Sequence, residues 1–352
     1  MSMIEILQNN LLSPLALAFA LGIFAKIIKS DLALPKDLYS SLSIYLLLAI
    51  GLKGGVELSH ASLQEIIWPA IATLCLGLIT PVTAFLTLRH IGRFSIADSA
   101  GIAAHYGSVS AVTFIAANQF VTAFKIPTEA YMPTLVTIME SPGIATALLI
   151  GVVLTARQTA VQTARVTSGG AVAGGPGMGL NLQTTETDHS GIWKAMHEVI
   201  TGRSMILMIG GMIIGYIIRT PGYEPVKPLF EGCFKGALTL FLLEMGLVAG
   251  SKLSDLKRCG PFLIAFGILM PIIHGAMGVC FAHWAGMSVG GCTVLGTMAA
   301  SASYIAAPPA VRMSLPEANP TLFLTLALGI TFPFNLLAGI PIYYRMACYL
   351  AN

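Results

Sequence analysis

Charged residues are scarce in this chain. Only 10% of its residues are Asp, Glu, Lys or Arg, whereas a soluble globular domain has about 25%. Hydrophobic residues make up 55%, and the mean hydropathy is +0.80. The alternating short segments of a transmembrane β-barrel are missing, and apolar runs of about 18 residues or more, each long enough to span a bilayer as a helix, recur throughout. The sequence therefore predicts an all-α integral membrane protein.

Several other signals are absent, and each absence excludes a class of function. The chain has no HExxH motif and no nucleophile elbow, so we expect no enzyme and no cofactor. It has no basic tract for nucleic acid, and its first ten residues lack the basic region of a cleaved signal peptide. The six cysteines show no CxxC spacing, so we expect free thiols.

Two stretches place small hydroxylated residues inside long apolar segments. The first is Ala103-Ala-His-Tyr-Gly-Ser-Val-Ser-Ala-Val-Thr113, and the second is Ala299-Ala-Ser-Ala-Ser-Tyr-Ile-Ala-Ala-Pro-Pro309. Gly, Ser and paired Pro loosen a helix, and a break at membrane depth is tolerated only where it is buried in protein or lines a wet cavity. Matching breaks in two halves of a chain point to the substrate site of a transporter.

The two halves of the chain repeat. Five short segments of the first half, which begin near residues 51, 77, 108, 126 and 141, match segments of the second half in the same order. The pattern predicts about ten spanning helices. We expect them at 11–29, 38–53, 63–88, 97–120, 131–156, 205–219, 233–250, 261–285, 289–310 and 321–347. Because five is an odd number, the second half enters the membrane from the opposite side, which makes the repeat an inverted one with broken fourth and ninth helices.

The division into domains follows from these halves. Residues 1–156 form the first five-helix repeat, and residues 201–352 form the second, inverted one. The Gly-rich polar stretch 157–200 reads as a flexible cytoplasmic linker. With the N-terminus outside, 6 of the 19 Lys and Arg residues fall in outer loops and the other 13 in inner loops, which favours both termini outside. The outer six are Lys53, Lys125, Arg219, Lys227, Lys235 and Arg345.

The break residues predict an anion site. A broken helix presents free N–H groups at the start of its second half, and those groups together with the helix dipole favour a small anion. Hydroxyl groups donate to the same anion or offer oxygen to a cation. The alternative is that small residues only allow close helix packing. The candidate substrate-binding residues are Gly107, Ser108, Ser110, Thr113, Ser301 and Ser303.

Deep polar residues near the breaks are candidates for ion coupling. Glu140 lies in the middle of the fifth predicted helix, where a carboxylate is costly and usually faces a pathway or a partner. It either braces the kink at Pro142 or holds a cation or a proton. Asn335 either satisfies backbone freed by Pro333 or ligates an ion. His105 could titrate, but a packing role is the more common one for a lone helical histidine. Glu244 falls outside the paired pattern, and we expect a structural role for it.

At these residues the chain resembles the sodium-dependent bicarbonate transporters of the SbtA type known from cyanobacteria. The matching stretches include Gly107-Ser-Val-Ser110, Pro308-Pro-Ala-Val-Arg312 and Pro316-Glu-Ala-Asn-Pro320. The resemblance implies an inner-membrane symporter that imports bicarbonate with sodium as the coupling ion. It also implies a homotrimer, a core domain that moves against a gate domain, and a PII-like cytoplasmic regulator. It assigns bicarbonate and sodium to Gly107, Ser108, Ser110, Thr113, Ser301 and Ser303.

The chain departs from the cyanobacterial pattern at three positions, so that it looks like a non-cyanobacterial member. Tyr304 replaces an Asp at the end of the second serine run, Glu140 replaces an Asp, and Ala302 replaces a hydroxylated residue. We expect Glu140, Tyr304 and Asn335 to take part in ion coupling, with Ser110, Glu140 and Ser303 as sodium ligands.

Three functions stay open at this point. The first is a sodium-coupled bicarbonate symporter, in which sodium supplies the positive charge that the breaks lack. The second is a transporter of another small anion, coupled to protons through Glu140 or His105. The third is a membrane sensor that binds ligand without transporting it and is regulated by a PII-like partner.

Overall fold

The computed structural model describes residue 5, residue 8, residues 10–60, 62–169, 197, 201–253 and 256–351, which are helical with short connections and contain no strand. Eight helical segments among them are long and apolar enough to cross a membrane. Two shorter apolar helices, Pro14–Ile27 and Val289–Ala299, accompany them. The prediction of an all-α multi-pass membrane protein is confirmed, whereas the arrangement of about ten helices in two inverted repeats stays a prediction.

The described residues of the first half include α-helices α2 to α7 and one π-helical turn, η1, which extends the end of α4. The break predicted in the fourth span separates α5 from α6. The end of the fifth span differs from the prediction, because α7 runs well beyond Ala156. The elements are α2 (Pro14–Ile27), α3 (Lys36–Leu58), α4 (Leu63–Leu86), η1 (Thr87–Ile91), α5 (Ile96–Gly107), α6 (Ala111–Ala123) and α7 (Met132–Gly169).

The second half is also helical, and its end is more broken. Its last span is interrupted by two π-helical segments, η4 and η5, on either side of Pro333. Proline there removes one backbone donor, and the wider turns are a common local adjustment. The elements are α9 (Arg203–Tyr223), η2 (Pro228–Gly232), α10 (Phe234–Lys252), α11 (Leu256–Trp284), α12 (Val289–Ala299), α13 (Ala307–Ser314), α14 (Pro320–Leu326), η4 (Ala327–Thr331), α15 (Phe332–Phe334), η5 (Asn335–Gly339) and α16 (Ile340–Ala351).

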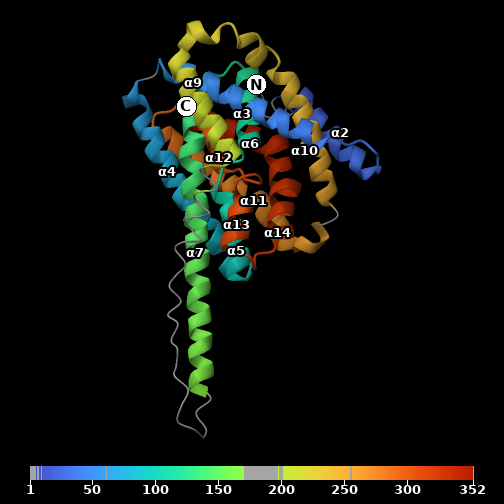
Figure 1. The fold of residues 1–352 in the computed structure, drawn as a ribbon, viewed down its shortest axis with the longest axis vertical. Helices are drawn as coiled ribbons and strands as arrows, with labels where there is room; N and C mark the ends of the chain where they lie inside the picture. The colour runs from blue at the N-terminus through green and yellow to red at the C-terminus, as the bar shows by residue number, and fades with distance from the viewer. Residues whose placement is uncertain are drawn as a thin grey trace.

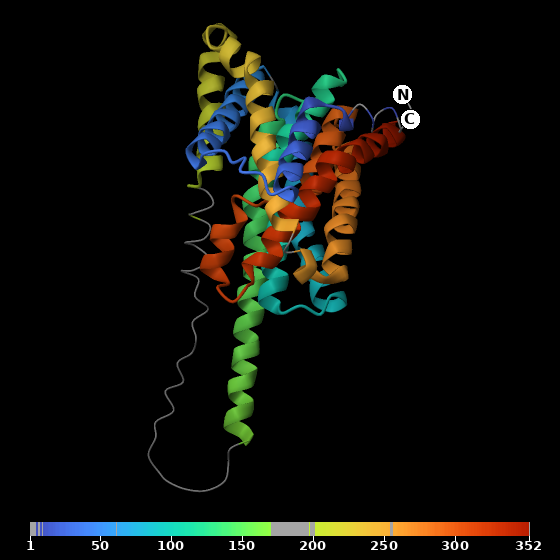
Figure 2. The ribbon, with the colours of Figure 1, turned by 90° about the vertical axis from the view of Figure 1, so that its right-hand side faces the viewer.

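The long helix α7 extends beyond the rest of the bundle (Figure 1). Residues 157–169 of the predicted linker therefore belong to this helix. The remainder of the predicted linker, apart from residue 197, lies outside the described residues. In Figures 1 and 2, α2 begins and α16 ends at the end of the bundle opposite the one from which α7 extends.

Four helices form two close pairs, each with one member from each half of the chain. Helix α3 packs along α9, and α2 packs along α10. Glycines allow the contact: a Cβ on Gly215 would come within 2.1 Å of the Leu52 carbonyl, and one on Gly246 within 2.1 Å of the Phe19 carbonyl. Small residues let membrane helices approach until their backbones touch, so these two pairs form a tightly packed unit.

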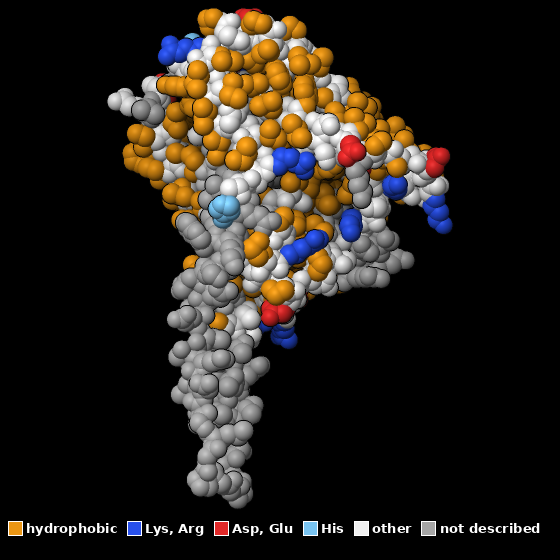
Figure 3. All heavy atoms as spheres, in the orientation of Figure 1, with side chains coloured by type: hydrophobic (Ala, Val, Ile, Leu, Met, Phe, Trp, Pro, Cys, Tyr) orange, Lys and Arg blue, Asp and Glu red, His pale blue; other side chains and the backbone are white. Residues whose placement is uncertain are grey.

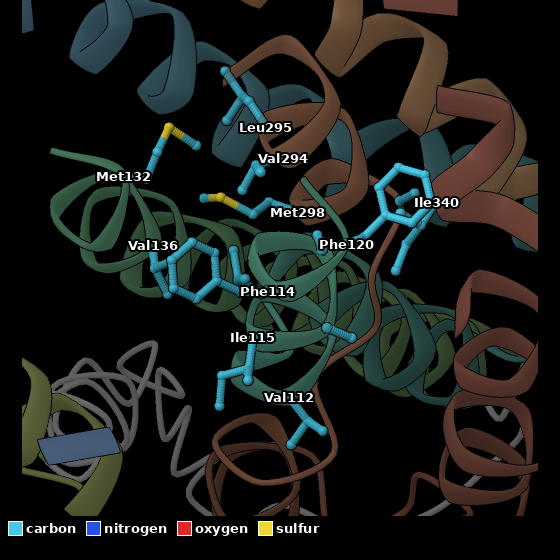
Figure 4. Close-up of a cluster of buried hydrophobic side chains, with 14 of the residues drawn as sticks. Val112, Phe114, Ile115, Phe120, Met132, Val136, Val294, Leu295, Met298 and Ile340 are labelled. Atoms are coloured by element: carbon cyan, nitrogen blue, oxygen red, sulfur yellow. The ribbon is translucent and has the colours of Figure 1, made fainter. Parts of the chain in front are cut away.

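The other helices pack around α5, α6 and α12. The segment Ile96–Ala123 is the most deeply placed of the eight candidate spans, with 94% of its apolar window buried. Figure 4 shows Val112, Phe114, Ile115 and Phe120 of α6 among side chains from α7, α12 and α16. Hydrophobic side chains also cover much of the outer face in Figure 3, as expected for a surface in contact with lipid. Both predicted breaks thus lie in the interior of the bundle.

Candidate functional site

The first break separates α5 from α6. Helix α5 ends at Gly107, Ser108 is extended (φ −108°, ψ 146°), and α6 begins at Ala111. Ser110 caps the new helix, because its Oγ accepts a hydrogen bond of 3.3 Å from the Thr113 N–H. Serine is a favoured N-cap residue, since its hydroxyl replaces a helical acceptor. The N-terminus of α6 therefore lies inside the protein.

The second break is longer. Helix α12 ends at Ala299 and α13 begins at Ala307, with non-helical backbone from Ser301 to Ser303 and a bend after it. The Ser303 Oγ accepts a hydrogen bond of 3.3 Å from the Ala306 N–H. Pro308 and Pro309 occupy the first turn of α13, where proline is tolerated because its missing N–H has no helical partner anyway.

The two breaks are in direct contact. The Ser110 N–H donates to the Ser301 Oγ at 2.9 Å, and the Ser303 N–H donates to the His105 carbonyl at 2.8 Å. The Ser301 hydroxyl in turn donates to the Met298 carbonyl at 2.7 Å. The structure thus brings together the residues that the sequence singles out, all of which are buried. These residues are Gly107, Ser108, Ser110, Thr113, Ser301 and Ser303.

Some polar groups at this crossing have no hydrogen-bond partner among the described residues. The Ser108 hydroxyl is buried and makes no hydrogen bond with any of them. No acceptor within the described chain is found for the N–H groups of Ala111 and Val112, in the first turn of α6. Buried polar groups are normally paired, so unpaired donors that converge on one place suit an anionic ligand.

Glu140 lies beside the first break. A Cβ on Gly143, one turn further along α7, would come within 1.7 Å of the Gly107 carbonyl. Residues three apart share a helix face, so Glu140 is on the face of α7 that packs against this break. Its side chain is 4% exposed. Among the described residues it is the only buried Asp, Glu, Lys or Arg, and it has no hydrogen bond or ion pair there.

Asn335 braces the second break from behind. Its Nδ2 donates to the Ala300 carbonyl at 2.8 Å, and its Oδ1 accepts from the Tyr343 hydroxyl at 3.0 Å. Of the two roles considered for Asn335, the structure shows contacts of the first kind, in which the side chain satisfies freed backbone. These two bonds use one of the two N–H donors of the Asn335 amide and one of the two lone pairs of its oxygen.

Tyr304 and His105 flank the crossing. The Tyr304 ring packs edge-on against Phe332, and its hydroxyl lies near Ser110 without a hydrogen bond of normal geometry. The His105 Nδ1 lies 2.7 Å from the Gly101 carbonyl, so this nitrogen carries the proton. Its ring stacks on Phe323, and its Nε2 is buried without a partner.

Two further predictions concern Glu244 and metal binding. Glu244 of α10 is half-buried, and Tyr39 at the start of α3 lies near it. No group of three or more His, Cys, Asp or Glu that could hold a metal occurs among the described residues. A cation at the crossing would therefore depend on hydroxyl and carbonyl oxygens with a single carboxylate.

Some contacts of the site could not be predicted from the sequence. A Cβ on Gly107 would meet Pro81 of α4 at 2.7 Å, and Gly143 contacts the same glycine from α7. The Tyr106 hydroxyl bonds the Thr331 hydroxyl, which donates to the Gly267 carbonyl at 2.9 Å. Pro81 and the Gly267 region are matched positions in the repeat, and that match is the one signal that could have indicated them.

Comparison with known families agrees with this geometry. The profile of the Na+-dependent bicarbonate transporter superfamily matches residues 14–348, nearly the whole chain. The chain belongs to this superfamily. Its members are transporters and not enzymes, as the missing catalytic motifs predict. Among curated proteins, none matches this chain.

Proposed function

We propose that this superfamily member is a sodium-dependent symporter that imports bicarbonate across the inner (plasma) membrane. The observation that carries the proposal is the hydrogen-bonded crossing of two broken helices, which has one buried carboxylate, Glu140, and no buried Lys or Arg among the described residues. A desolvated anion without a fixed positive charge is costly, so it needs a cation that binds with it.

The anion binds at the first break in this proposal. The free N–H groups at the start of α6 and the Ser108 hydroxyl supply donors, and the positive end of the helix dipole supplies charge. Bicarbonate is small, flat and rich in acceptor oxygens, which suits several donors within one crossing. The substrate residues are Gly107, Ser108, Ser110, Thr113, Ser301 and Ser303.

Sodium binds next to the anion, with Ser110, Glu140 and Ser303 as ligands and with Tyr304 and Asn335 near it. Sodium prefers oxygen ligands, and the second break is rich in hydroxyl and carbonyl oxygens. Its positive charge attracts both the anion and the Glu140 carboxylate, which has no counter-ion among the described residues.

Reciprocal contacts between the halves support an inverted repeat with residues 1–156 and 201–352 as its two units. The loop after α6 reaches the start of α12, where Glu129 Oε1 accepts from the Ser288 N–H at 2.5 Å. The loop after α13 reaches the start of α5, where Asp98 Oδ1 accepts from the Asn319 N–H at 2.8 Å. Such an exchange is what a two-fold axis in the membrane plane produces.

The same proposal includes the remaining features that the resemblance implies. Both termini lie outside, the linker 157–200 lies in the cytoplasm, the protein is a homotrimer, and a PII-like regulator binds its cytoplasmic face. The charge distribution supports the orientation. Accessibility of tags placed at each terminus and in the linker tests it.

Uptake of labelled bicarbonate into proteoliposomes tests the transport function. We expect uptake to require an inward sodium gradient and to fail when potassium replaces sodium. Uptake that ignores sodium, or no uptake by protein that is folded and inserted, rejects the proposal.

A second candidate is proton-coupled transport of another small anion. The specific observation in its favour is the buried, unpaired His105 Nε2, in a chain with Tyr304 where the related pattern has an Asp. Uptake driven by a pH gradient and indifferent to sodium would favour this candidate. Thermal stabilisation of the purified protein by bicarbonate and by rival anions, each with sodium or potassium, separates the two.

A further inference from the structure

A polar cavity of about 230 Å³ lies at the end of the bundle where α3 and α6 end and α10 begins. We name it the vestibule. Under the proposed orientation it faces the outside. The polar side chains that line it and that matter here are Lys53, Glu57, Asn118, Gln119, Glu231 and Lys235.

The vestibule lies on the helix faces that lead to the crossing. On α6, Ala111, Ile115, Asn118 and Thr122 recur at spacings of three and four, so they share one face. That face starts at the first break and ends in the vestibule. On α3, residues 43, 46, 47, 50, 53, 54 and 57 form the facing stripe.

An apolar layer separates the vestibule from the break. Leu46 and Leu47 of α3, Val112 and Ile115 of α6, and Phe241 of α10 leave a gap of only about 10 Å³ between them. A solute in the vestibule is thus in line with the crossing but held off from it. This arrangement suits a site where a solute binds before it reaches the crossing.

Not every charged side chain in the vestibule forms an ion pair with another described residue. Lys53 is loosely paired with Glu57 at 3.9 Å, and Glu129 is held by the Ser288 N–H at the start of α12. Lys235 is exposed and makes no ion pair with any described residue. The vestibule therefore has an uncommitted ammonium group near two amide side chains, Asn118 and Gln119.

We propose that the vestibule is a second, low-affinity subsite that holds the incoming oxyanion on Lys235 before it reaches the crossing, with Asn118 and Gln119 as hydrogen-bond donors. Glu231, in the same cavity, attracts the accompanying cation. The identity of the anion as bicarbonate rests on the proposed function, whereas the subsite itself rests on the cavity and its charges.

Transport kinetics test the role of Lys235. The vestibule carries both signs of charge, so its attraction for an oxyanion depends on the Lys235 ammonium, which makes no ion pair with any described residue. We expect Lys235→Gln to raise the KM for bicarbonate about three- to tenfold at low ionic strength, to leave the maximal rate unchanged, and to lose its effect at high salt. Lys227→Gln is the matched control, because Lys227 pairs with Glu224 at 3.1 Å and does not line the vestibule.

A second measurement needs no transport. Thr122→Cys places a thiol in the vestibule, in a background where the six native cysteines are replaced by alanine. We expect the ratio of its reaction rates with an anionic and a cationic thiosulfonate to fall several-fold when Lys235→Gln is added, and not when Lys227→Gln is added. An unchanged ratio, or a KM that does not move, overturns the subsite. Absent uptake by the unmodified protein overturns the proposed function alone, since the rate ratio still reports on the vestibule.

Discussion

The two breaks have the same position in their halves of the chain, but they offer a ligand opposite groups. The first is short, and it ends at a capped α6 whose first N–H groups have no protein acceptor. The second is longer and ends at Pro308 and Pro309, which have no N–H to offer. The first break is thus rich in donors, and the second is rich in hydroxyl and carbonyl oxygens.

This difference shows how one crossing without a buried Lys or Arg among the described residues can accommodate two ions of opposite sign. Two identical breaks would compete for the same ligand. With one donor-rich and one acceptor-rich break in contact, an anion and a cation can lie side by side, and each lowers the desolvation cost of the other. Four experiments test this comparison, from the largest expected effect to the smallest.

Glu140→Gln removes the one buried charge that the described part of the site contains. Loss of one partner of a buried charge pair costs about 2–5 kcal/mol, so we expect sodium affinity to fall by about thirtyfold or more. Sodium titrations by calorimetry, in the absence of bicarbonate, measure the change. Glu244→Gln, at a half-buried acid near Tyr39, is the control and should keep sodium affinity. Sodium binding that survives Glu140→Gln would contradict the coupling role.

Gly143→Ala pushes a methyl group against the Gly107 carbonyl. Overpacking of this kind costs about 1–3 kcal/mol, and it displaces the first break. We expect uptake to fall about tenfold and the melting temperature to drop. Gly210→Ala is matched to it, because a Cβ on Gly210 meets nothing within 4 Å. If Gly143→Ala and Gly210→Ala reduced uptake equally, close contact between Gly143 and Gly107 would not be required for transport.

Asn335→Ala separates bracing of the second break from ligation of an ion. Leaving the Ala300 carbonyl unpaired costs about 1–3 kcal/mol of stability. Asn10→Ala removes a comparable amide bond, 2.8 Å long, to the Leu336 carbonyl instead of to a carbonyl of the break. We expect both variants to lose stability in denaturation experiments and only Asn335→Ala to weaken sodium binding. A loss of sodium affinity with unchanged stability would instead make Asn335 a direct ligand.

Ser108→Ala and Ser303→Ala compare the two breaks directly. The Ser108 hydroxyl makes no bond within the described chain, so its removal should leave stability unchanged. We expect Ser108→Ala to raise the KM for bicarbonate by about three- to tenfold, as loss of one hydrogen bond of about 1 kcal/mol predicts. Ser303→Ala should weaken sodium binding measured without bicarbonate. If both variants changed the bicarbonate KM and the sodium affinity to the same extent, the assignment of the anion to the first break and of sodium to the second would be wrong.

The sequence was sufficient to predict the positions of both breaks. Gly, Ser and paired Pro act on local backbone, so their effect at Gly107–Ser110 and Ser301–Pro309 is visible without a fold. The hydrophobic spans are equally local, and the all-helical membrane architecture followed from them. Helix ends were less certain, as the continuation of α7 to Gly169 shows.

Contacts between distant residues could not be predicted in the same way. How the helices cross in space determines the hydrogen bond from Asn335 to the Ala300 carbonyl and the close contact between Gly143 and Gly107. The sequence could not decide the role of Asn335, because an amide side chain can either pair with free backbone groups or ligate an ion. The vestibule could not be predicted from the sequence either, since residues that line it come from α3, α6 and α10 and share no motif.

The bond between the Ser110 N–H and the Ser301 Oγ joins residues 191 positions apart. Contacts so remote in the chain form late in folding, because a long loop must close before they can stabilise anything. During synthesis, the first half enters the bilayer before the second, and neither half alone contains the crossing. Completion of this fold therefore depends on the joining of the two halves, and the crossing forms only at that last step.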